Sequence, residues 1–146
     1  MTEKDVGEAL AIERDVFPSP WTRGMFLQEL SNEDSYFIVV REKEKLIGYG
    51  GFFMIGEVAR LENLAVHPDF RRRGVATKLL RELLATVKAN GGDETTLEVR
   101  SGNQEAQNLY RKFGFLISGK RPEFYGDNRE DALIMSKKIV ERVAKD

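Results

Sequence analysis

A strand, a long helix and a second strand follow one another in the middle of this chain, and this order constrains the fold more than any other feature. The helix is predicted over 74–89, where apolar residues recur as a wide stripe at helical spacing: Val75, Ala76, Leu79, Leu80, Leu83, Leu84 and Val87. The strand before it reads ARLENLAV, and the strand after it reads TLEVR. Two strands joined through a helix are typical of parallel neighbours, so a mixed sheet is expected.

The remaining elements are helices and antiparallel strands. Before the central unit we expect helices over 2–17 and 22–30, then a hairpin of YFIVVR and LIGYGGFFMI around a loop of about four residues. After it, NQEAQNLYRKFG is predicted to be a helix, and FLISGKR and DALIMSKKI are predicted to be strands. The order ααβββαβαββ predicts the α/β (α+β) class, with helices on both faces of the sheet.

The length of 146 residues fits one domain with one core. No repeat or long linker divides the chain, so 1–146 is expected to form a single domain, with 137–146 as a polar tail. No apolar run approaches the ~20 residues that a membrane-spanning helix needs, and the start MTEKDVGEAL lacks the apolar stretch of a signal peptide. A cytoplasmic protein without a membrane partner is therefore expected.

The composition restricts the chemistry. The chain has no cysteine and a single histidine, His67, which argues against disulfides, thiolate nucleophiles, a histidine-rich metal site and a Ser-His-Asp triad. It has 23 basic and 24 acidic residues, so the net charge of −1 offers little attraction to a nucleic-acid backbone. We therefore expect no metal and no nucleic-acid partner.

Three arginines, Arg71, Arg72 and Arg73, precede Gly74 at the predicted start of the central helix. Each opposes the helix dipole, at a cost of roughly 0.3–1 kcal/mol at low salt. A bound anion would offset this cost, because the first helical N–H groups, the permissive glycine and the guanidiniums can all face it. The alternative is a solvated run of charge. The glycine spacing matches neither a Walker loop nor a Rossmann turn.

The stretch LAVHPDFRRRGVATKLL, followed by LEVRSGNQEAQNLYRKFGF, resembles the GNAT superfamily of acyl-CoA N-acyltransferases, and the likeness covers nearly the whole chain. It implies acetyl-CoA as co-substrate, with its pyrophosphate at the arginine–glycine turn and its pantetheine arm along a bulged strand. It also implies a mainly antiparallel sheet that is splayed at this strand. The residues implied to bind acetyl-CoA are Leu64, Ala65, Val66, Arg71, Arg72, Arg73, Gly74, Val75, Ala76, Thr77 and Asn103. A helix cap is the alternative role of Asn103.

The resemblance further implies Glu98 as the general base and Tyr110 as the acid that serves the departing thiolate. An ordinary glutamate pKa of ~4.3 is low for this task, so a raised pKa or an intervening water is expected. The alternatives are an exposed strand-end carboxylate for Glu98 and core packing for Tyr110. Glu62 competes for the base role, because other members of the superfamily carry a carboxylate on the bulged strand. His67 is expected to be a loop residue.

Two flanking stretches, FPSPWTRGMFLQEL and YGDNREDALIM, resemble the branch that acetylates the N-terminal alanine of bacterial ribosomal small-subunit protein eighteen. A protein N-terminus is therefore the expected acceptor, with Gly50 and Gly51 leaving room for a peptide and Tyr125 and nearby carboxylates closing over it. Another N-terminus, a lysine, or a small polyamine or amino-sugar is the alternative, and the two glycines can instead mark a strand bulge. An acyl-CoA sensor without turnover is a further alternative.

The chain departs from its relatives at the start. Relatives begin with a short strand before the first helix, whereas MTEKD leads directly into the predicted helix. Either the sheet lacks the N-terminal edge strand or the start site is displaced, and both alternatives affect the sheet edge more than the chemistry.

Overall fold

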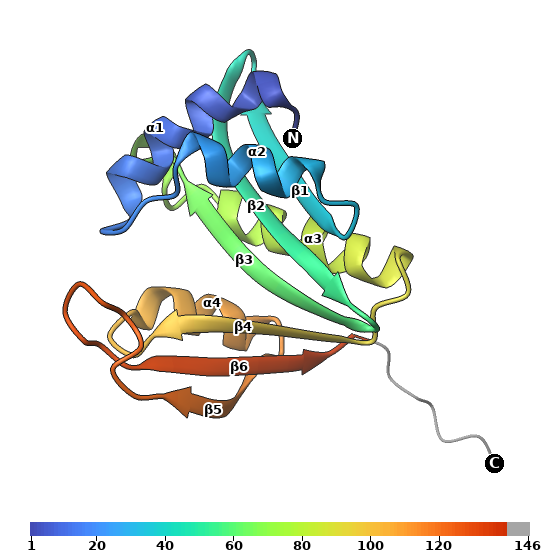
Figure 1. Cartoon of the computed structure of the whole chain (residues 1–146), viewed down its shortest axis with the longest axis vertical. Helices are drawn as coiled ribbons and strands as arrows, with labels where there is room; N and C mark the ends of the chain where they lie inside the picture. Colours follow the sequence, from blue (N-terminus) through green and yellow to red (C-terminus); the bar gives the residue numbers. More distant parts are fainter. Residues whose placement is uncertain (140–146) are drawn as a thin grey trace. The chain divides into compact units, whose positions relative to one another are not determined.

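The computed structural model of the chain describes residues 1–139 (Figure 1). Its elements in chain order are η1 (Glu3–Asp5), α1 (Val6–Val16), α2 (Arg23–Ser31), β1 (Ser35–Glu42), β2 (Lys45–Ile55), β3 (Val58–Val66), η2 (Pro68–Phe70), α3 (Val75–Ala89), β4 (Glu94–Arg100), α4 (Gln104–Lys112), β5 (Leu116–Arg121) and β6 (Ala132–Lys138). Within this part of the chain, no helix is long and apolar enough to cross a membrane. The cytoplasmic location stays a prediction.

The strands follow the order β1-β2-β3-β4-β6-β5 through their hydrogen bonds. The pairs β1–β2, β4–β6 and β5–β6 are antiparallel, whereas Val58–Arg60 of β3 pairs in parallel with Glu94–Thr96 of β4. The predicted mixed, mainly antiparallel sheet is therefore confirmed. Within residues 1–139 no strand precedes α1, and β1 forms one edge of the sheet. This agrees with the expectation that the edge strand of the relatives is missing here.

Three boundaries differ from those predicted. The β1–β2 loop contains two residues, Lys43 and Glu44, because polar side chains on an edge strand face water without ending the backbone pairing. The first helix begins with the 3-10 turn η1, capped reciprocally by Thr2 and Asp5, before α1 starts. The tail predicted from 137 is wrong at its start, because Lys137 and Lys138 pair with β4; residues 140–146 lie outside the described residues.

The described residues divide into two compact units. Unit 1 contains Met1–Phe53 and Leu61–Leu83, and unit 2 contains Met54–Arg60 and the chain from Leu84 onward. The prediction of a single domain stays a prediction.

Unit 1 has an apolar layer on each side of its strands, because side chains alternate between the two faces. Helices α1 and α2 cover one face and α3 covers the other (Figure 1). The buried residues of the first layer include Val6, Ala9, Leu10, Ile12, Phe26, Phe37, Tyr49 and Ala65. Those of the second are Ile47, Val75 and Leu79, with Ile38, Val40, Leu64 and Val66 packed against them.

A buried carboxylate, Glu13, links four segments of unit 1. The Trp21 N–H donates to Glu13 Oε1 at 3.0 Å, and Asn63 Nδ2 donates to Oε2 at 3.2 Å. The Tyr49 hydroxyl also donates to Oε2. Burial raises the pKa of Glu13 above its ordinary value, although the hydrogen bonds from Trp21 and Asn63 oppose the rise.

Unit 2 has buried apolar residues of its own. The buried apolar residues of this unit include Ala59, Val87, Leu97, Val99, Phe115, Ala132 and Met135. Gln107 of α4 is 2% exposed, and its Nε2 donates to the carbonyls of Arg100 and Ser101, both at 3.0 Å. These bonds fasten α4 to the end of β4, and so place the next turn of the helix, which carries Tyr110.

Candidate active site

The turn that leads into α3 has an irregular backbone in unit 1. Arg72 and Gly74 both adopt positive φ, at 63° and 77°. A Cβ added at Gly74 would meet nothing within 4 Å, so the backbone conformation, and not crowding, requires glycine there. Arg72 adopts the same region at a cost of about 1 kcal/mol or more. Turns of this kind can direct successive N–H groups into an anion-binding concavity.

The start of α3 adds donors to this turn. Lys78 N donates to Gly74 O at 3.0 Å. The N–H groups of Val75, Ala76 and Thr77 come before this bond, where a helix offers no carbonyl partner. The side chain of Arg73 is 59% exposed, and its guanidinium lies 5.0 Å from the Phe70 ring centroid. The turn therefore fits a phosphate group, with backbone donors and adjacent guanidiniums.

The three strand residues predicted to line the pantetheine arm point to different faces of β3. Ala65 is buried in the layer of α1 and α2, whereas Leu64 and Val66 pack in the layer of α3. The side chains of these three residues cannot all face one ligand, so only their backbone groups could line the pantetheine arm together. This backbone contact is what the sequence predicts, and it stays a prediction.

Glu98 lies near the end of β4 in unit 2, and its side chain is 10% exposed. Its Oε1 forms an ion pair with Arg60 Nη2 of β3 and lies 3.5 Å from Arg121 Nε of β5. The alternative of an exposed strand-end carboxylate is therefore wrong. Two guanidiniums fix the position of this carboxylate and balance its charge.

Tyr110 lies on α4, with its ring 5.7 Å from that of Phe115 in an edge-to-face contact. Burial raises the pKa of Tyr110 to about 12, and the charge of Tyr125 adds to the rise. The phenol therefore remains protonated well above neutral pH. Core packing and a proton-donating role are compatible in this position.

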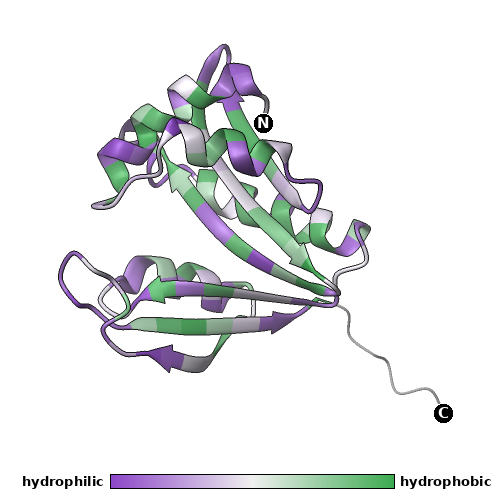
Figure 2. Cartoon of the chain, viewed as in Figure 1, coloured by the Kyte–Doolittle hydropathy of each residue, from purple (hydrophilic) through white to green (hydrophobic). Residues whose placement is uncertain are grey.

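Tyr125 lies in the loop 122–131 between β5 and β6, which is largely hydrophilic (Figure 2). Burial raises the pKa of its phenol, Arg100 opposes the rise, and the charge of Glu98 adds to it. Glu98, Tyr110 and Tyr125 all lie in unit 2, and the charge of Glu98 and the neighbouring phenol contribute to the raised pKa values of Tyr125 and Tyr110, respectively. Their joint role in one site stays a prediction.

The loop carboxylates predicted to hold the acceptor already have a partner. Arg100 Nη2 lies 3.0 Å from Asp127 Oδ2, and Arg100 Nη1 lies 3.4 Å from Glu130 Oε1. The basic residues around Glu98 and Tyr125 are thus Arg60, Arg100 and Arg121, none of which was predicted to belong to the site. Their positions on β3, β4 and β5 gave no signal in the sequence, because the pairing of distant strands brings them together.

Gly50 and Gly51 of β2 make room for the protein's own side chains. A Cβ at Gly50 would lie 2.8 Å from Leu83 Cδ1, and a Cβ at Gly51 would overlap the Phe37 ring. The β1–β2 register is regular at both glycines, so they mark no bulge in this pair of strands. A role of these glycines in substrate binding stays a prediction, without support from this packing.

The other predicted polar residues have local partners. Asn103 caps α4, and its side chain accepts from Ala106 N at 3.1 Å. His67 lies in the loop after β3, as expected, and its Nδ1 accepts from Asp69 N at 3.1 Å. Glu62 lies on β3 in unit 1, with Oε1 buried. Roles of Asn103 in cofactor binding and of Glu62 in catalysis stay predictions.

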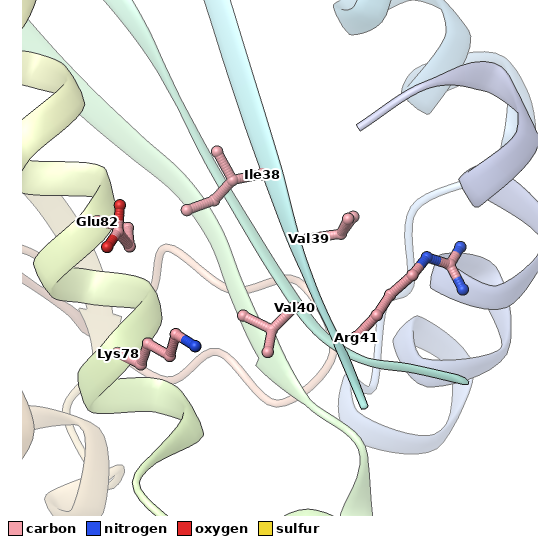
Figure 3. Close-up of a pocket in the computed structure, with 6 residues that line it drawn as sticks. All are labelled: Ile38, Val39, Val40, Arg41, Lys78 and Glu82. Atoms are coloured by element: carbon pink, nitrogen blue, oxygen red, sulfur yellow. The ribbon is translucent and has the colours of Figure 1, made fainter. Parts of the chain in front are cut away.

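A hollow lies beside β1 in unit 1, and Lys78, which follows the predicted site residue Thr77, is among its lining residues. Figure 3 shows Ile38 and Val40 on the side of α3, near Lys78 and Glu82, whereas Val39 and Arg41 point to the other side of the strand. The hollow follows from the edge position of β1. Among residues 1–139, no group of three or more His, Cys, Asp or Glu side chains is placed to hold a metal ion.

Known proteins resemble this chain over most of its length. A Bacillus subtilis (strain 168) protein, named provisionally as a [ribosomal protein bS18]-alanine N-acetyltransferase, is 36% identical over 136 residues, which cover 92% of this chain and 90% of that protein. The Escherichia coli (strain K12) [ribosomal protein bS18]-alanine N-acetyltransferase is 31% identical, with 90% of each chain covered. The crystal structure of the ribosomal-protein-S18-alanine N-acetyltransferase from Escherichia coli superposes with a TM-score of 0.90 at 29% identity, covering 99% of this chain and 94% of that one.

The family itself is matched across most of the chain. Residues 7–115 match the acetyltransferase (GNAT) family. This segment includes β3, the arginine–glycine turn, Glu98 and Tyr110. The chain therefore belongs to the acetyltransferase (GNAT) family and is an acetyl-CoA-dependent N-acetyltransferase.

Proposed function

We propose that this enzyme acetylates the α-amino group of a protein N-terminus, and that its acceptor is the N-terminal alanine of bacterial ribosomal protein bS18. The names of the relatives support this acceptor. The observation that carries the proposal is the carboxylate of Glu98, held by Arg60 and Arg121 in the same unit as Tyr110 and Tyr125, two phenols whose pKa is raised by burial. A carboxylate and phenols of this kind suit the removal of one proton and the donation of another.

When bound, acetyl-CoA supplies the activated thioester. The N–H groups of Val75, Ala76 and Thr77 and the guanidiniums of the preceding turn would hold its pyrophosphate. The backbone of Leu64, Ala65 and Val66 would bind its pantetheine arm and offer an N–H to the developing oxyanion. The positive φ of Gly74 and the open space beside it support the phosphate role.

Glu98 would accept the proton of the acceptor amine, directly or through a water. Both guanidinium contacts are made by Oε1, so we assign proton acceptance to Oε2. An α-amine has a pKa of ~7.7–8.0, against ~10.4 for lysine, so its neutral form costs roughly 3–4 kcal/mol less near pH 7. Glu98, acting directly or through a water, suits this easier deprotonation.

Tyr110 would donate a hydrogen bond to the departing thiolate. With a phenol pKa of about 12 and a thiol pKa of ~8.5, complete proton transfer would be uphill by roughly 5 kcal/mol. The phenol therefore serves better as a hydrogen-bond donor that stabilises the developing charge than as a full proton source. This conclusion refines the acid role that the sequence predicts.

The charge balance around Glu98 favours a single amine over a polyamine. Three carboxylates, Glu98, Asp127 and Glu130, are matched by three guanidiniums, Arg60, Arg100 and Arg121. A polyamine carries several cationic charges and would need an excess of carboxylates to bind well. A peptide N-terminus brings one amine and a backbone.

The test is a comparison of acceptors at a saturating concentration of acetyl-CoA. The release of the coenzyme A thiol should give a kcat/KM for an alanine-starting bS18 peptide at least about 10²-fold above that for spermidine or an amino-sugar, a difference of roughly 2.7 kcal/mol. A higher kcat/KM for the polyamine would contradict the proposal. Acetyl-CoA binding without turnover of any acceptor would favour an acyl-CoA sensor.

A further inference from the structure

One guanidinium fastens the loop 122–131 to the end of β4 in unit 2. Arg100, the last residue of β4, donates from Nη1 to Asp127 Oδ1 and from Nη2 to Asp127 Oδ2, both at 3.0 Å. This two-point contact fixes both the distance and the plane of the carboxylate. The Arg100 side chain is 20% exposed and that of Asp127 is 27% exposed, so the two-point geometry, more than burial, gives this contact its strength.

A second carboxylate, Glu130, joins the loop to the same place. Glu130 Oε1 lies 3.4 Å from Arg100 Nη1, and Glu130 Oε2 accepts from the Gly102 N–H at 2.6 Å. Glu130 thus contacts the end of β4 and the turn that follows it. The loop is held at two acidic residues, three positions apart.

The same guanidinium lies over the ring of Tyr125. Its central carbon is 4.0 Å from the ring centroid, which is a close cation–π contact. The Tyr125 N–H donates to the Glu130 carbonyl at 3.1 Å, which closes the loop around the ring. The side chain and the backbone of Tyr125 are therefore both positioned through contacts that begin at Arg100.

We propose that Arg100 is a positioning residue for the acceptor: it holds the loop 122–131, and with it the Tyr125 phenol, at the end of β4. Arg100 acts through Tyr125 and does not touch the acceptor amine. The inference rests on the proposed function, because it gives this loop the task of covering a peptide N-terminus. It also assigns Asp127 and Glu130 to holding the loop, in place of binding the acceptor ammonium.

The geometry explains why arginine is needed at this position. A guanidinium is planar, so it can bind a carboxylate at two points and stack on an aromatic ring at the same time. A lysine would keep the charge but lose both the two-point contact and the flat stacking surface. Arg100→Lys is therefore expected to restore only part of the function that Arg100→Gln removes.

The experiment compares steady-state kinetics of four full-length variants with an alanine-starting peptide. Arg100→Gln should raise the KM for the peptide about tenfold or more, with kcat changed less than about threefold and the KM for acetyl-CoA unchanged. Asp127→Asn should give a similar rise, and the double variant should add little to it, because both changes break the same contact. Arg129→Gln, in the same exposed loop, is the control and should leave the peptide KM unchanged.

Hydrogen exchange of the Tyr125 amide provides a readout without turnover. The exchange should be faster in Arg100→Gln and Asp127→Asn than in the wild type and in Arg129→Gln. An unchanged peptide KM in Arg100→Gln would overturn the inference. So would an equal rise in the KM values for the peptide and for acetyl-CoA together with a lower Tm. A wild-type enzyme that does not turn over the peptide would contradict the proposed function instead.

Discussion

Glu98 of β4 and Arg60 of β3 form an ion pair within unit 2, two residues beyond the parallel pairing of Arg60 with Thr96. The pairing of the two strands therefore sets the position of the carboxylate. Arg121 of β5 contacts the same oxygen, so three strands determine where Glu98 lies. If Glu98 is the base, as proposed, a carboxylate fixed in this way would need little reorganisation when a substrate amine approaches.

Replacing this carboxylate should reduce turnover without weakening cofactor binding. Glu98→Gln is expected to lower kcat by about 10²–10⁴, the range for loss of an acid–base group, with the Kd for acetyl-CoA nearly unchanged. Glu94→Gln is a matched control, because Glu94 lies on the same face of β4 and pairs with Lys138 at 3.6 Å. Steady-state kinetics and calorimetric titration give the two quantities.

A comparison with Glu62 decides which carboxylate is the base. Glu62→Gln should be milder than Glu98→Gln. If Glu62→Gln is the severe variant and Glu98→Gln keeps its kcat, the base is on β3 and the assignment of Glu98 is wrong.

Tyr110 should act in its protonated form throughout the working range. Its pKa is raised to about 12, whereas an α-amine loses its proton near ~7.7–8.0. Tyr110→Phe is therefore expected to lower kcat about 10²–10³-fold, as for loss of a charge-stabilising donor, and by the same factor from about pH 7 to about pH 10. The pH profiles of kcat test this, and a factor that shrinks as pH rises toward 9 would show that the phenol ionises in that range.

A substitution in the turn before α3 should weaken acetyl-CoA binding, whereas a matched substitution elsewhere should lower only the stability. Gly74→Val is expected to weaken acetyl-CoA binding at least about tenfold, because a bulky residue disfavours positive φ and fills the space beside the phosphate. Gly56→Val is the matched control: Gly56 has φ 61° and, like Gly74, nothing within 4 Å of an added Cβ. Both variants should lose about 1 kcal/mol of stability, and equal cofactor affinity in the two would refute the phosphate site.

Glu13 and Glu8, both on α1, should affect stability with opposite dependence on pH. Burial raises the pKa of Glu13, so the native state binds its proton more tightly, and the unfolding free energy falls as pH rises through the raised pKa. The Leu46 N–H and Arg41 lower the pKa of Glu8, so its contribution is present above its ordinary pKa and is lost as pH falls.

Urea unfolding of the wild type, Glu13→Gln and Glu8→Gln across a pH series measures these contributions. The unfolding free energy of the wild type minus that of Glu13→Gln should decrease as pH rises above 4.5, the ordinary pKa of a glutamate. The unfolding free energy of the wild type minus that of Glu8→Gln should decrease as pH falls below the same value. Parallel pH profiles for the two variants would contradict the opposite shifts.

The order of elements could be predicted because each carries a local signal. The stripe of apolar residues over 74–89 and the alternation of ARLENLAV indicate α3 and β3 without information from distant residues. The β1–β2 loop was predicted too long, because EKEK is polar, whereas an edge strand can continue through polar residues.

The candidate site could be predicted only where a motif is contiguous. The arginine–glycine turn is one short segment, so its place at the start of α3 followed from the sequence. The contacts of Glu98 with Arg60 and Arg121 join residues 38 and 23 positions apart along the chain, and strand pairing alone brings them together. The packing of Leu83 over Gly50 likewise depends on tertiary contacts that composition does not encode.

The most direct measurement is the site of acetylation on a peptide that offers two kinds of amine. An alanine-starting bS18 peptide with an internal lysine, in free and N-terminally blocked forms, is incubated with the enzyme and acetyl-CoA, and tandem mass spectrometry locates the acetyl group. The α-amine of the free peptide should be acetylated and the blocked peptide should remain unmodified. Acetylation of the blocked peptide on its lysine would contradict the assignment of an N-terminal α-amine as the acceptor.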